Sequence, residues 1–273
     1  MKLAFAGIRH MGLLFWALIS VLPLVYMLSA SLQSNQEIYQ GVHLIPQNLN
    51  WDNYIQAWQQ ASFSTYFGNS LFYTVTIVLG TLIISTLSAY AFARLEFPGK
   101  NLAYYLFLIF LIIPIPGVFI PLYVLLVNLH LVDTRIGYIL PMINSSLPVA
   151  IFILRSFFED IPRELEEAAL IDGAGTFRIY RSIALPLAKP AIATIAIFTA
   201  LGAWNEFLLA LIVFSSHDLM PLQVGLQTFQ GTYFSQYALM MAATAITTIP
   251  IVILYFCMQK YIIRGIMAGA LKG

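Results

Sequence analysis

The residues best suited to a specific role lie between Ile161 and Pro186, in one long polar interval of an otherwise apolar chain. Glu167-Ala168-Ala169 is followed after three residues by Gly173, and then after nine residues by Ile183 and Leu185-Pro186. The small alanines permit close approach of another surface, and the neighbouring acids can form polar contacts with it. The interval therefore predicts a docking surface for another protein. A helix pair lying on lipid headgroups is the alternative, which the acidic first half of the interval disfavours because anionic headgroups would repel it.

Nucleotide, metal and catalytic chemistry have little support in the sequence. No Walker A pattern occurs, and the glycine-rich run 172–175 lacks the Lys-Ser/Thr that would bind phosphate, so we interpret it as a turn. The four histidines are scattered and Cys257 stands alone, which gives no metal-ligand spacing. We expect no catalytic residue, no metal and no cofactor in this chain, which excludes ATP hydrolysis by the chain itself.

One acid, Glu206, lies in the middle of a long apolar interval, beside Asn205. Ionisable groups within a membrane are costly and usually face a cavity or a partner. The pair could line a pathway for a hydroxyl-rich solute, since the Asn205 amide suits sugar hydroxyls. It could equally make a structural hydrogen bond to a neighbouring helix or to another subunit. An intramembrane enzyme would need paired acids, a Ser/His pair or a histidine cluster, and a single acid disfavours it.

The elements that position these residues follow from composition. Of the 273 residues, 60% are apolar and only 9% are charged, whereas soluble domains have about 25% charged residues. Lipid is therefore the solvent for most of the chain. The net charge of +1 gives no support for a nucleic-acid partner.

The charge-free intervals predict an all-α membrane protein with six transmembrane helices, since a bilayer requires about 20 apolar residues per helix. The expected spans are residues 11–31, 67–93, 103–127, 137–158, 190–214 and 238–260. The third contains Pro114, Pro116 and Pro121, which predict a bend because proline removes a backbone hydrogen bond. The bend could line a pathway or merely shape the packing.

The distribution of lysine and arginine predicts the orientation, because cytoplasmic segments carry an excess of them. With the N-terminus in the cytoplasm, twelve of the thirteen basic residues lie on the inner side and only Arg135 lies outside. Both termini and the polar interval are then cytoplasmic. We expect residues 1–65 to form the first helix and an outer loop, residues 66–262 to form a five-helix core that includes a loop at 159–188, and residues 263–273 to form a cytoplasmic tail.

Within the 159–188 loop, the periodicity predicts two short helices joined by a glycine turn. The first carries the acids and has Asp160 as its N-terminal cap, and the second begins with Thr176 as its cap. Gly173 is expected to end the first helix in the left-handed conformation that glycine adopts readily.

At its full spacing, the pattern in the 159–188 loop resembles the EAA loop found in permease subunits of bacterial ABC importers. Residues 204–207 and the tail 259–273 further resemble the carbohydrate-uptake branch, which is similar to the smaller membrane subunit of the maltose transporter. The resemblance implies a type I importer permease fold in the bacterial cytoplasmic membrane.

The resemblance also implies partners and site residues. The positions Glu167, Ala168, Ala169, Asp172 and Gly173 would form a coupling helix seated on one of two ATPase subunits, which bind ATP-Mg. A second permease, distinct from this chain, would complete a heterodimer. The outer loop 217–237 would contact an extracytoplasmic solute-binding protein through the following glutamines: Gln223, Gln227 and Gln230. A solvated loop without a partner is the alternative for that segment.

The solute itself stays open at this point. The carbohydrate branch implies a sugar or a sugar-like solute. The same architecture could import a non-sugar solute such as a polyol or a glycerophosphodiester, and six spans with a docking loop do not distinguish the two.

Overall fold

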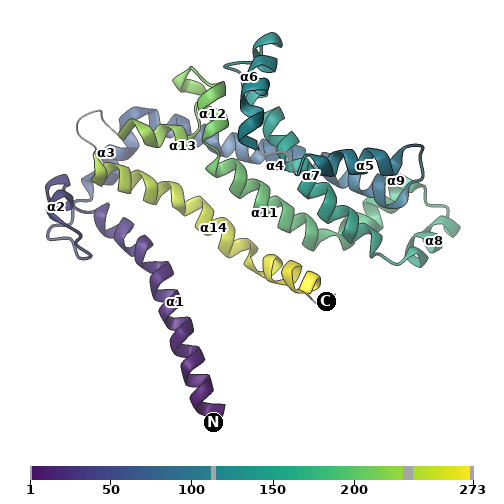
Figure 1. Ribbon diagram of the computed structural model, residues 1–273, viewed down its shortest axis with the longest axis horizontal. Coiled ribbons are helices and arrows are strands. Elements are labelled where there is room, and N and C mark those ends of the chain that lie inside the picture. Colours follow the sequence, from purple (N-terminus) through teal and green to yellow (C-terminus); the bar gives the residue numbers. More distant parts are fainter. Residues whose placement is uncertain (1, 112–114, 230–235, 271–273) are drawn as a thin grey trace. The chain divides into compact units, whose positions relative to one another are not determined.

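The computed structural model describes residues 2–111, 115–229 and 236–270, and within these ranges the chain forms helices and turns without any strand (Figure 1). Four described helices contain a stretch long and apolar enough to cross a membrane. They are α1 (Lys2–Ala30), α4 (Phe63–Arg94), α7 (Arg135–Glu159) and α14 (Tyr237–Ala270). A fifth span results if the run Thr176–Leu187 and helix α11 (Lys189–Asn205), which meet at 75°, are counted as one. The all-α membrane fold predicted from composition is confirmed.

The chain divides into two compact units. One comprises residues 1–67 and 224–250, and the other comprises residues 68–223 and 251–273. Both α4 and α14 contribute to the two units, because each helix passes through a boundary between them.

The first unit contains α1, two short helices, α2 (Asn35–Gln40) and α3 (Asp52–Gln59), and the 3-10 turn Gln60–Ser62. The apolar stretch of α1 buries no residue within the chain, as expected for a helix surrounded by lipid or by another subunit. Hydrogen bonds from buried side-chain amides stabilise the polar segment that follows α1. The Asn53 amide donates to the carbonyls of Ser31 and Gln33 at 2.9 Å each, which satisfies backbone acceptors that would otherwise be buried without a partner.

In the second unit, α4 is the central helix. Its inward face repeats every four residues, as helix geometry requires, and consists of fully buried side chains: Tyr73, Ile77, Thr81, Ser85 and Ala89. Close packing against α7 needs a glycine, because a Cβ built on Gly80 would lie 2.5 Å from the Ile143 Cδ1 atom. No proline interrupts the 32 residues of α4.

The third expected span differs from a single helix over residues 103–127. It consists of α5 (Lys100–Ile109), a 3-10 turn (Ile115–Val118) and α6 (Phe119–Asn128). Pro116 lies in the turn and Pro121 lies in the first turn of α6, where a missing N–H is tolerated. The interruption predicted from the prolines is therefore present, although Pro114 itself lies outside the described residues.

The fifth expected span, residues 190–214, is also interrupted. Helix α11 ends at Asn205, and α12 (Leu208–Val213) begins after two non-helical residues. The chain continues through a 3-10 turn (His217–Leu219), α13 (Leu222–Gly225) and a second 3-10 turn (Leu226–Phe229). The expectation of one continuous helix was wrong here, because the backbone is extended at Glu206.

The 159–188 loop folds as two short helical runs separated by a glycine turn, as predicted (Figure 1). The first is α8 (Arg163–Ile171). The second comprises α9 (Thr176–Ile179), a π-helical turn (Tyr180–Ala184) and α10 (Leu185–Leu187). The predicted caps were displaced by one or more residues, since Pro162 and Gly175 occupy the N-cap positions of α8 and α9, in place of Asp160 and Thr176.

Candidate functional site

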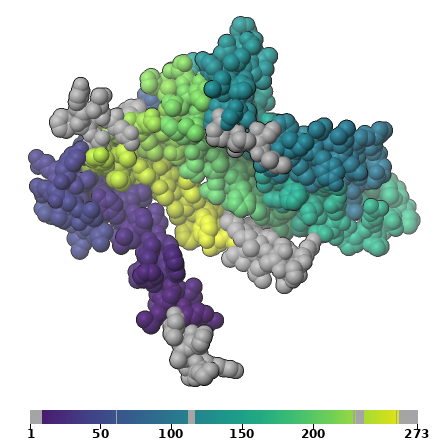
Figure 2. Space-filling model, viewed as in Figure 1, coloured from purple at the N-terminus to yellow at the C-terminus, as the bar shows by residue number. Residues whose placement is uncertain are grey.

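The base of the 159–188 loop is buried in the second unit, and its tip is exposed. Ile161, Ile179 and Ala184 are buried, whereas no residue of α8 is. At the tip, the side chains of Ile171 and Phe177 are 87% and 68% exposed. Large apolar side chains are exposed along the spans as well, but these two lie on a polar loop, where they are available to another molecule, and the space-filling view shows α8 at the surface (Figure 2).

Arg94, the last residue of α4, holds α8 against the bundle. Its guanidinium donates to the Ile161 carbonyl, and its Nε atom lies 2.9 Å from the Glu166 carboxylate as an ion pair without hydrogen-bond geometry. Only 6% of the Arg94 side chain and 15% of the Glu166 side chain are exposed. Breaking a pair this deeply buried would leave an uncompensated charge, so the contact strongly favours one position of α8.

Aromatic residues anchor the second helical run of the loop. The Tyr180 hydroxyl and the Thr86 hydroxyl are 2.9 Å apart across a buried hydrogen bond. The Tyr90 ring packs between Phe158 and Tyr180, with ring centroids 5.7 Å and 5.2 Å away. Both halves of the loop are therefore attached to the Arg94 end of α4.

The turn between the two helical runs is a Schellman motif. The Ala174 N–H donates to the Ala169 carbonyl at 2.9 Å, and the Gly173 N–H donates to the Leu170 carbonyl at 3.0 Å. Gly173 has φ of +76°, a left-handed conformation that favours glycine, as predicted. The paired carbonyls make the tip a defined structure rather than a loose connection.

The predicted docking residues lie on or directly after α8. Glu167, Ala168, Asp172 and Gly173 are exposed, and Ala169 is half-buried. Glu166 and Glu167 differ although they are adjacent, because Glu166 faces Arg94 and Glu167 faces outward. The sequence alone did not indicate which of the two acids forms an ion pair within the chain, because Arg94, the partner of Glu166, lies 72 positions earlier.

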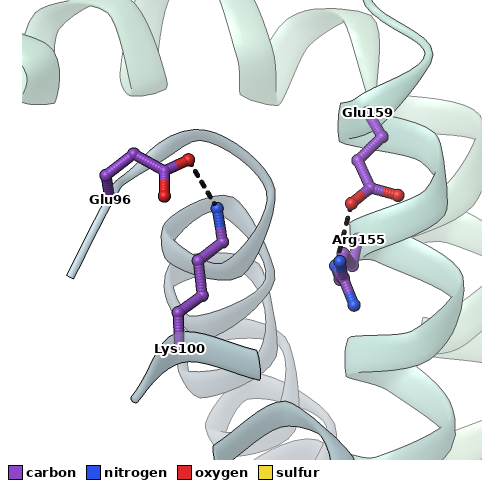
Figure 3. A network of polar contacts seen from close by, with 4 residues as sticks. All are labelled: Glu96, Lys100, Arg155 and Glu159. Carbon is purple, nitrogen blue, oxygen red and sulfur yellow. Dashed lines mark hydrogen bonds and ion pairs between the residues drawn. The ribbon is translucent and has the colours of Figure 1, made fainter. Parts of the chain in front are cut away.

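Further charged groups gather at the same end of the second unit. Lys100 pairs with Glu96 at 3.1 Å and Arg155 pairs with Glu159 at 2.9 Å, and the partners in each pair are four residues apart (Figure 3). The Arg155 guanidinium also lies over the Tyr104 ring, 3.7 Å from its centroid. Within the described ranges, no group of three or more His, Cys, Asp or Glu side chains could hold a metal ion.

The second candidate site is the break between α11 and α12. A helix that begins inside a membrane leaves N–H groups without partners, and these must be satisfied locally. The Glu206 carboxylate accepts a hydrogen bond from the Leu209 N–H at 2.8 Å, which supplies one such partner. This geometry gives Glu206 a structural role at the start of α12, and it leaves the exposed Asn205 side chain next to the opened backbone.

The structure brings together two of the predicted polar residues. The Gln223 amide donates to the Asn205 Oδ1 atom at 3.4 Å, although the two residues were assigned to different sites from the sequence. Gln227 is exposed and has no such link to this pair in the described contacts. Gln230 lies outside the described residues.

The segment 215–222, which precedes Gln223, is fixed by residues that the sequence did not single out. The Asp133 carboxylate accepts hydrogen bonds from the Ser215 and Ser216 N–H groups at 2.9 Å each, and from the Ser216 hydroxyl. These bonds, that of the hydroxyl first, lower the pKa of Asp133 below its usual range. Asp133 has φ of +57°, an uncommon conformation for a residue other than glycine, which these contacts hold in place.

Helix α4 holds the same segment from its other side. The Asn69 amide donates to the carbonyls of Asp218 and Met220 at 2.7 Å and 3.1 Å. Ser70 accepts from the Leu222 N–H at 2.7 Å, and the Tyr73 hydroxyl donates to the Leu219 carbonyl at 2.8 Å. The only signal in the sequence was Asn69, the one amide side chain in a helix whose other uncharged polar groups are hydroxyls.

The sequence of the chain is similar to a known family of proteins. Residues 82–268 match the family model described as the binding-protein-dependent transport system inner membrane component. The chain is 35% identical to the diacetylchitobiose uptake system permease protein NgcG of Streptomyces coelicolor, over 98% of this chain and 89% of that protein. It is 38% identical to the arabinooligosaccharides transport system permease protein AraQ of Halalkalibacterium halodurans, over 96% and 95% of the two chains.

A solved structure agrees with these relatives. It is a bacterial ABC transporter involved in the import of the acidic polysaccharide alginate, and one of its chains superposes with a TM-score of 0.85 at 27% identity. The superposition covers 94% of this chain and 96% of the other. The chain thus belongs to the family of inner-membrane permease components of binding-protein-dependent transport systems.

Proposed function

We propose that this chain forms half of the translocation pathway of an ATP-driven sugar importer and is coupled to a separate ATPase through the 159–188 loop. The observation that carries the proposal is the contrast within that loop. Its base is fixed to α4 by Arg94 and Tyr180, and its tip exposes Ile171 and Phe177. A rigid projection with an apolar, acidic tip is suited to receive force from a docked protein.

Two ATPase subunits would bind ATP-Mg and supply that force, and this chain would contribute no catalytic residue. The contact would include the following residues: Glu167, Ala168, Ala169, Asp172 and Gly173. Because both halves of the loop are attached to the same bundle, movement of a docked ATPase would rotate the bundle as a body. Such rotation switches a central cavity between the two sides of the membrane.

The orientation follows from the basic residues. We place Arg94, Lys100 and Arg155 together with the 159–188 loop on the cytoplasmic side, and both termini on that side as well. The opposite face would meet an extracytoplasmic solute-binding protein through Gln223, Gln227 and Gln230. The second half of the pathway would come from a different permease chain, which forms a heterodimer with this one.

The solute we propose is a sugar, most simply an oligosaccharide. The relatives named above are uptake proteins for diacetylchitobiose and for arabinooligosaccharides, and the matching solved transporter imports alginate. The break at Glu206 fits this solute, since discontinuous helices expose polar groups near the middle of a membrane. Asn205, which the Gln223 amide meets at 3.4 Å, would supply an amide donor and acceptor for sugar hydroxyls.

The test of ATPase coupling is Glu167→Lys in the complete transporter reconstituted in proteoliposomes. Reversing this exposed charge should leave the chain inserted and assembled but separate ATP hydrolysis from solute uptake. Glu96→Lys is the control, because it makes the same charge change on an exposed side chain outside the loop and removes only an exposed ion pair, which contributes little to stability. Normal uptake per ATP hydrolysed by the Glu167→Lys transporter would overturn the coupling role.

The test of the solute is thermal melting of the solute-binding protein encoded with this chain, in the presence of sugars, polyols and glycerophosphodiesters. A ligand that binds the folded protein raises its melting temperature in proportion to its concentration and affinity. An oligosaccharide should give the largest rise. Stabilisation by a polyol or a glycerophosphodiester alone would replace the sugar assignment.

A further inference from the structure

Residues 68–94 of helix α4 are the longest uninterrupted helical segment of the second unit. The 32 residues of the whole helix correspond to roughly 48 Å at 1.5 Å per residue. The helix contains no proline, whereas the other three long spans contain Pro23, the pair Pro141 and Pro148, and Pro250. Since sharp kinks arise mainly at proline, α4 is the stiffest of the four spans.

Both ends of α4 hold a segment that is distant in sequence. At the Ser70 end, four hydrogen bonds attach residues 218–222 to Asn69, Ser70 and Tyr73. At the Arg94 end, the 159–188 loop is attached through Arg94 to α8 and through Thr86 and Tyr90 to Tyr180. A displacement of either segment must therefore move α4 or break several contacts.

The other routes between the two segments within the second unit contain a proline or a break. Helix α7 runs unbroken from beside Asp133, which holds Ser215 and Ser216, to the 159–188 loop, but it contains Pro141 and Pro148. The α5–α6 region contains the 3-10 turn at 115–118 between its helices. Helix α11 bends by 75° from the run before it and ends at Asn205. Only the route through α4 is a single helix without proline among the described residues that touch both segments.

We propose that α4 is the strut through which docking of the solute-binding protein at the 215–222 segment is transmitted to the 159–188 loop. Asn69, Ser70 and Tyr73 at one end and Arg94 at the other act as positioning residues. The inference rests on the proposed function, since it takes Gln223 as part of the binding-protein contact and the 159–188 loop as the ATPase contact. Gln223 follows directly after the segment that α4 holds, so a protein bound there pushes on the Ser70 end.

The experiment measures ATP hydrolysis by the complete reconstituted transporter, with and without its solute-binding protein loaded with the solute identified by melting. Tyr73→Phe removes one hydroxyl and keeps the ring that stacks on Phe214, so it preserves the packing. Asn69→Ala removes two hydrogen bonds. Both variants should retain unstimulated hydrolysis, and Asn69→Ala should reduce stimulation by the loaded binding protein about fivefold, the equilibrium change that one net hydrogen bond supports.

Non-additivity separates transmission from ordinary destabilisation. Arg94→Gln should also reduce the stimulation of ATP hydrolysis. The double variant Asn69→Ala/Arg94→Gln should be stimulated as much as the more impaired of the two single variants. Residues that serve one link show such coupling, whereas distant independent sites have additive effects. Thr76→Ala on α4 and Lys100→Gln near its Arg94 end are the matched controls and should stay stimulated.

The outcomes are distinguishable from failure of the proposed function. If the wild-type transporter shows no stimulation by its loaded binding protein, the proposed function fails. If the wild type is stimulated and the assembled Tyr73→Phe and Asn69→Ala transporters are stimulated equally, the strut is overturned. Multiplicative losses in the double variant would also overturn it, because the two ends would then act independently.

Discussion

Helices α4 and α11 start from similar sequences and end as opposite structures. Both are apolar, and both carry an adjacent pair of polar residues, Asn69-Ser70 in α4 and Asn205-Glu206 at the end of α11. In α4 the pair lies within an unbroken helix and binds another segment of the chain. In α11 the helix stops at the pair, and Glu206 serves the start of the next helix.

The difference shows that the hydrogen-bond partner of a polar side chain determines whether the helix continues or ends there. Asn69 and Ser70 meet carbonyl and N–H groups of the 218–222 segment, so the α4 backbone keeps its own hydrogen bonds. Glu206 instead accepts from a backbone N–H three residues later, which is possible only where the helix has opened. One region is therefore suited to transmit movement and the other to expose polar atoms.

The largest expected effect concerns the break. Glu206→Leu removes the acceptor of the Leu209 N–H and should lower the free energy of unfolding by about 1–3 kcal/mol, the cost of an unsatisfied buried donor. Glu206→Gln keeps a side-chain oxygen and should cost much less. Denaturation of the purified chain in detergent measures the stability of both variants. Equal stability of Glu206→Leu and wild type would show that Glu206 does not stabilise the start of α12.

A smaller loss of stability is expected at the end of α8, which ends in a glycine turn. Gly173→Ala places a Cβ in the left-handed region and should cost roughly 1–2 kcal/mol locally. Hydrogen exchange of residues 168–176 should accelerate accordingly. Gly175→Ala is the control, because Gly175 has φ of −75° and open space around a Cβ; similar acceleration in both variants would show that conformation is not the cause.

The packing of α4 tests the other half of the comparison. Gly80→Ala places a Cβ against the Ile143 side chain and should destabilise the α4–α7 contact by about 1 kcal/mol after the gain in helix propensity is subtracted. Gly68→Ala meets nothing within 4 Å and should stabilise α4 by up to about 1 kcal/mol. Thermal melting of the two variants should shift in opposite directions, and shifts of the same sign would contradict the close approach.

The smallest effect is the pH dependence at Asp133. Its hydrogen bonds lower the pKa in the folded chain below the ordinary value of 3.8, so the folded state binds fewer protons than the unfolded state between the two values. The stabilisation is complete above the ordinary pKa and is lost as the pH falls through the lowered one. The difference in melting temperature between wild type and Asp133→Ala should therefore shrink from about pH 7 to about pH 3. A difference that grows on acidification would contradict the assignment.

The sequence was sufficient for the elements that depend on local composition. The long apolar intervals predicted α1, α4, α7 and α14, because each hydrophobic run identifies a span by itself. The glycine turn at Gly173 was predicted for the same reason, since a left-handed helix end requires little beyond its own residues.

Contacts between distant positions were not accessible. Arg94 and Glu166 are separated by 72 positions, which include α5, α6 and α7, and Asp133 meets Ser216 across 83 positions, so neither pairing has a periodic signal. The Arg135 guanidinium likewise lies over the ring of Phe72, 63 positions earlier, at 5.0 Å from its centroid. The break at Glu206 was missed because no proline lies near it, and Asn205-Glu206 was interpreted as a polar pair within a continuous helix.

The adjacent acids of α8 have one consequence for experiments on the isolated chain. Glu166 is satisfied from within, so reversing its charge repels Arg94 and would be visible in the purified subunit alone. Glu167 points outward, and the same reversal there would leave the purified subunit unchanged. Two neighbouring and chemically identical side chains thus divide between a defect of folding and a defect of coupling, and only the presence of a partner protein reveals the second.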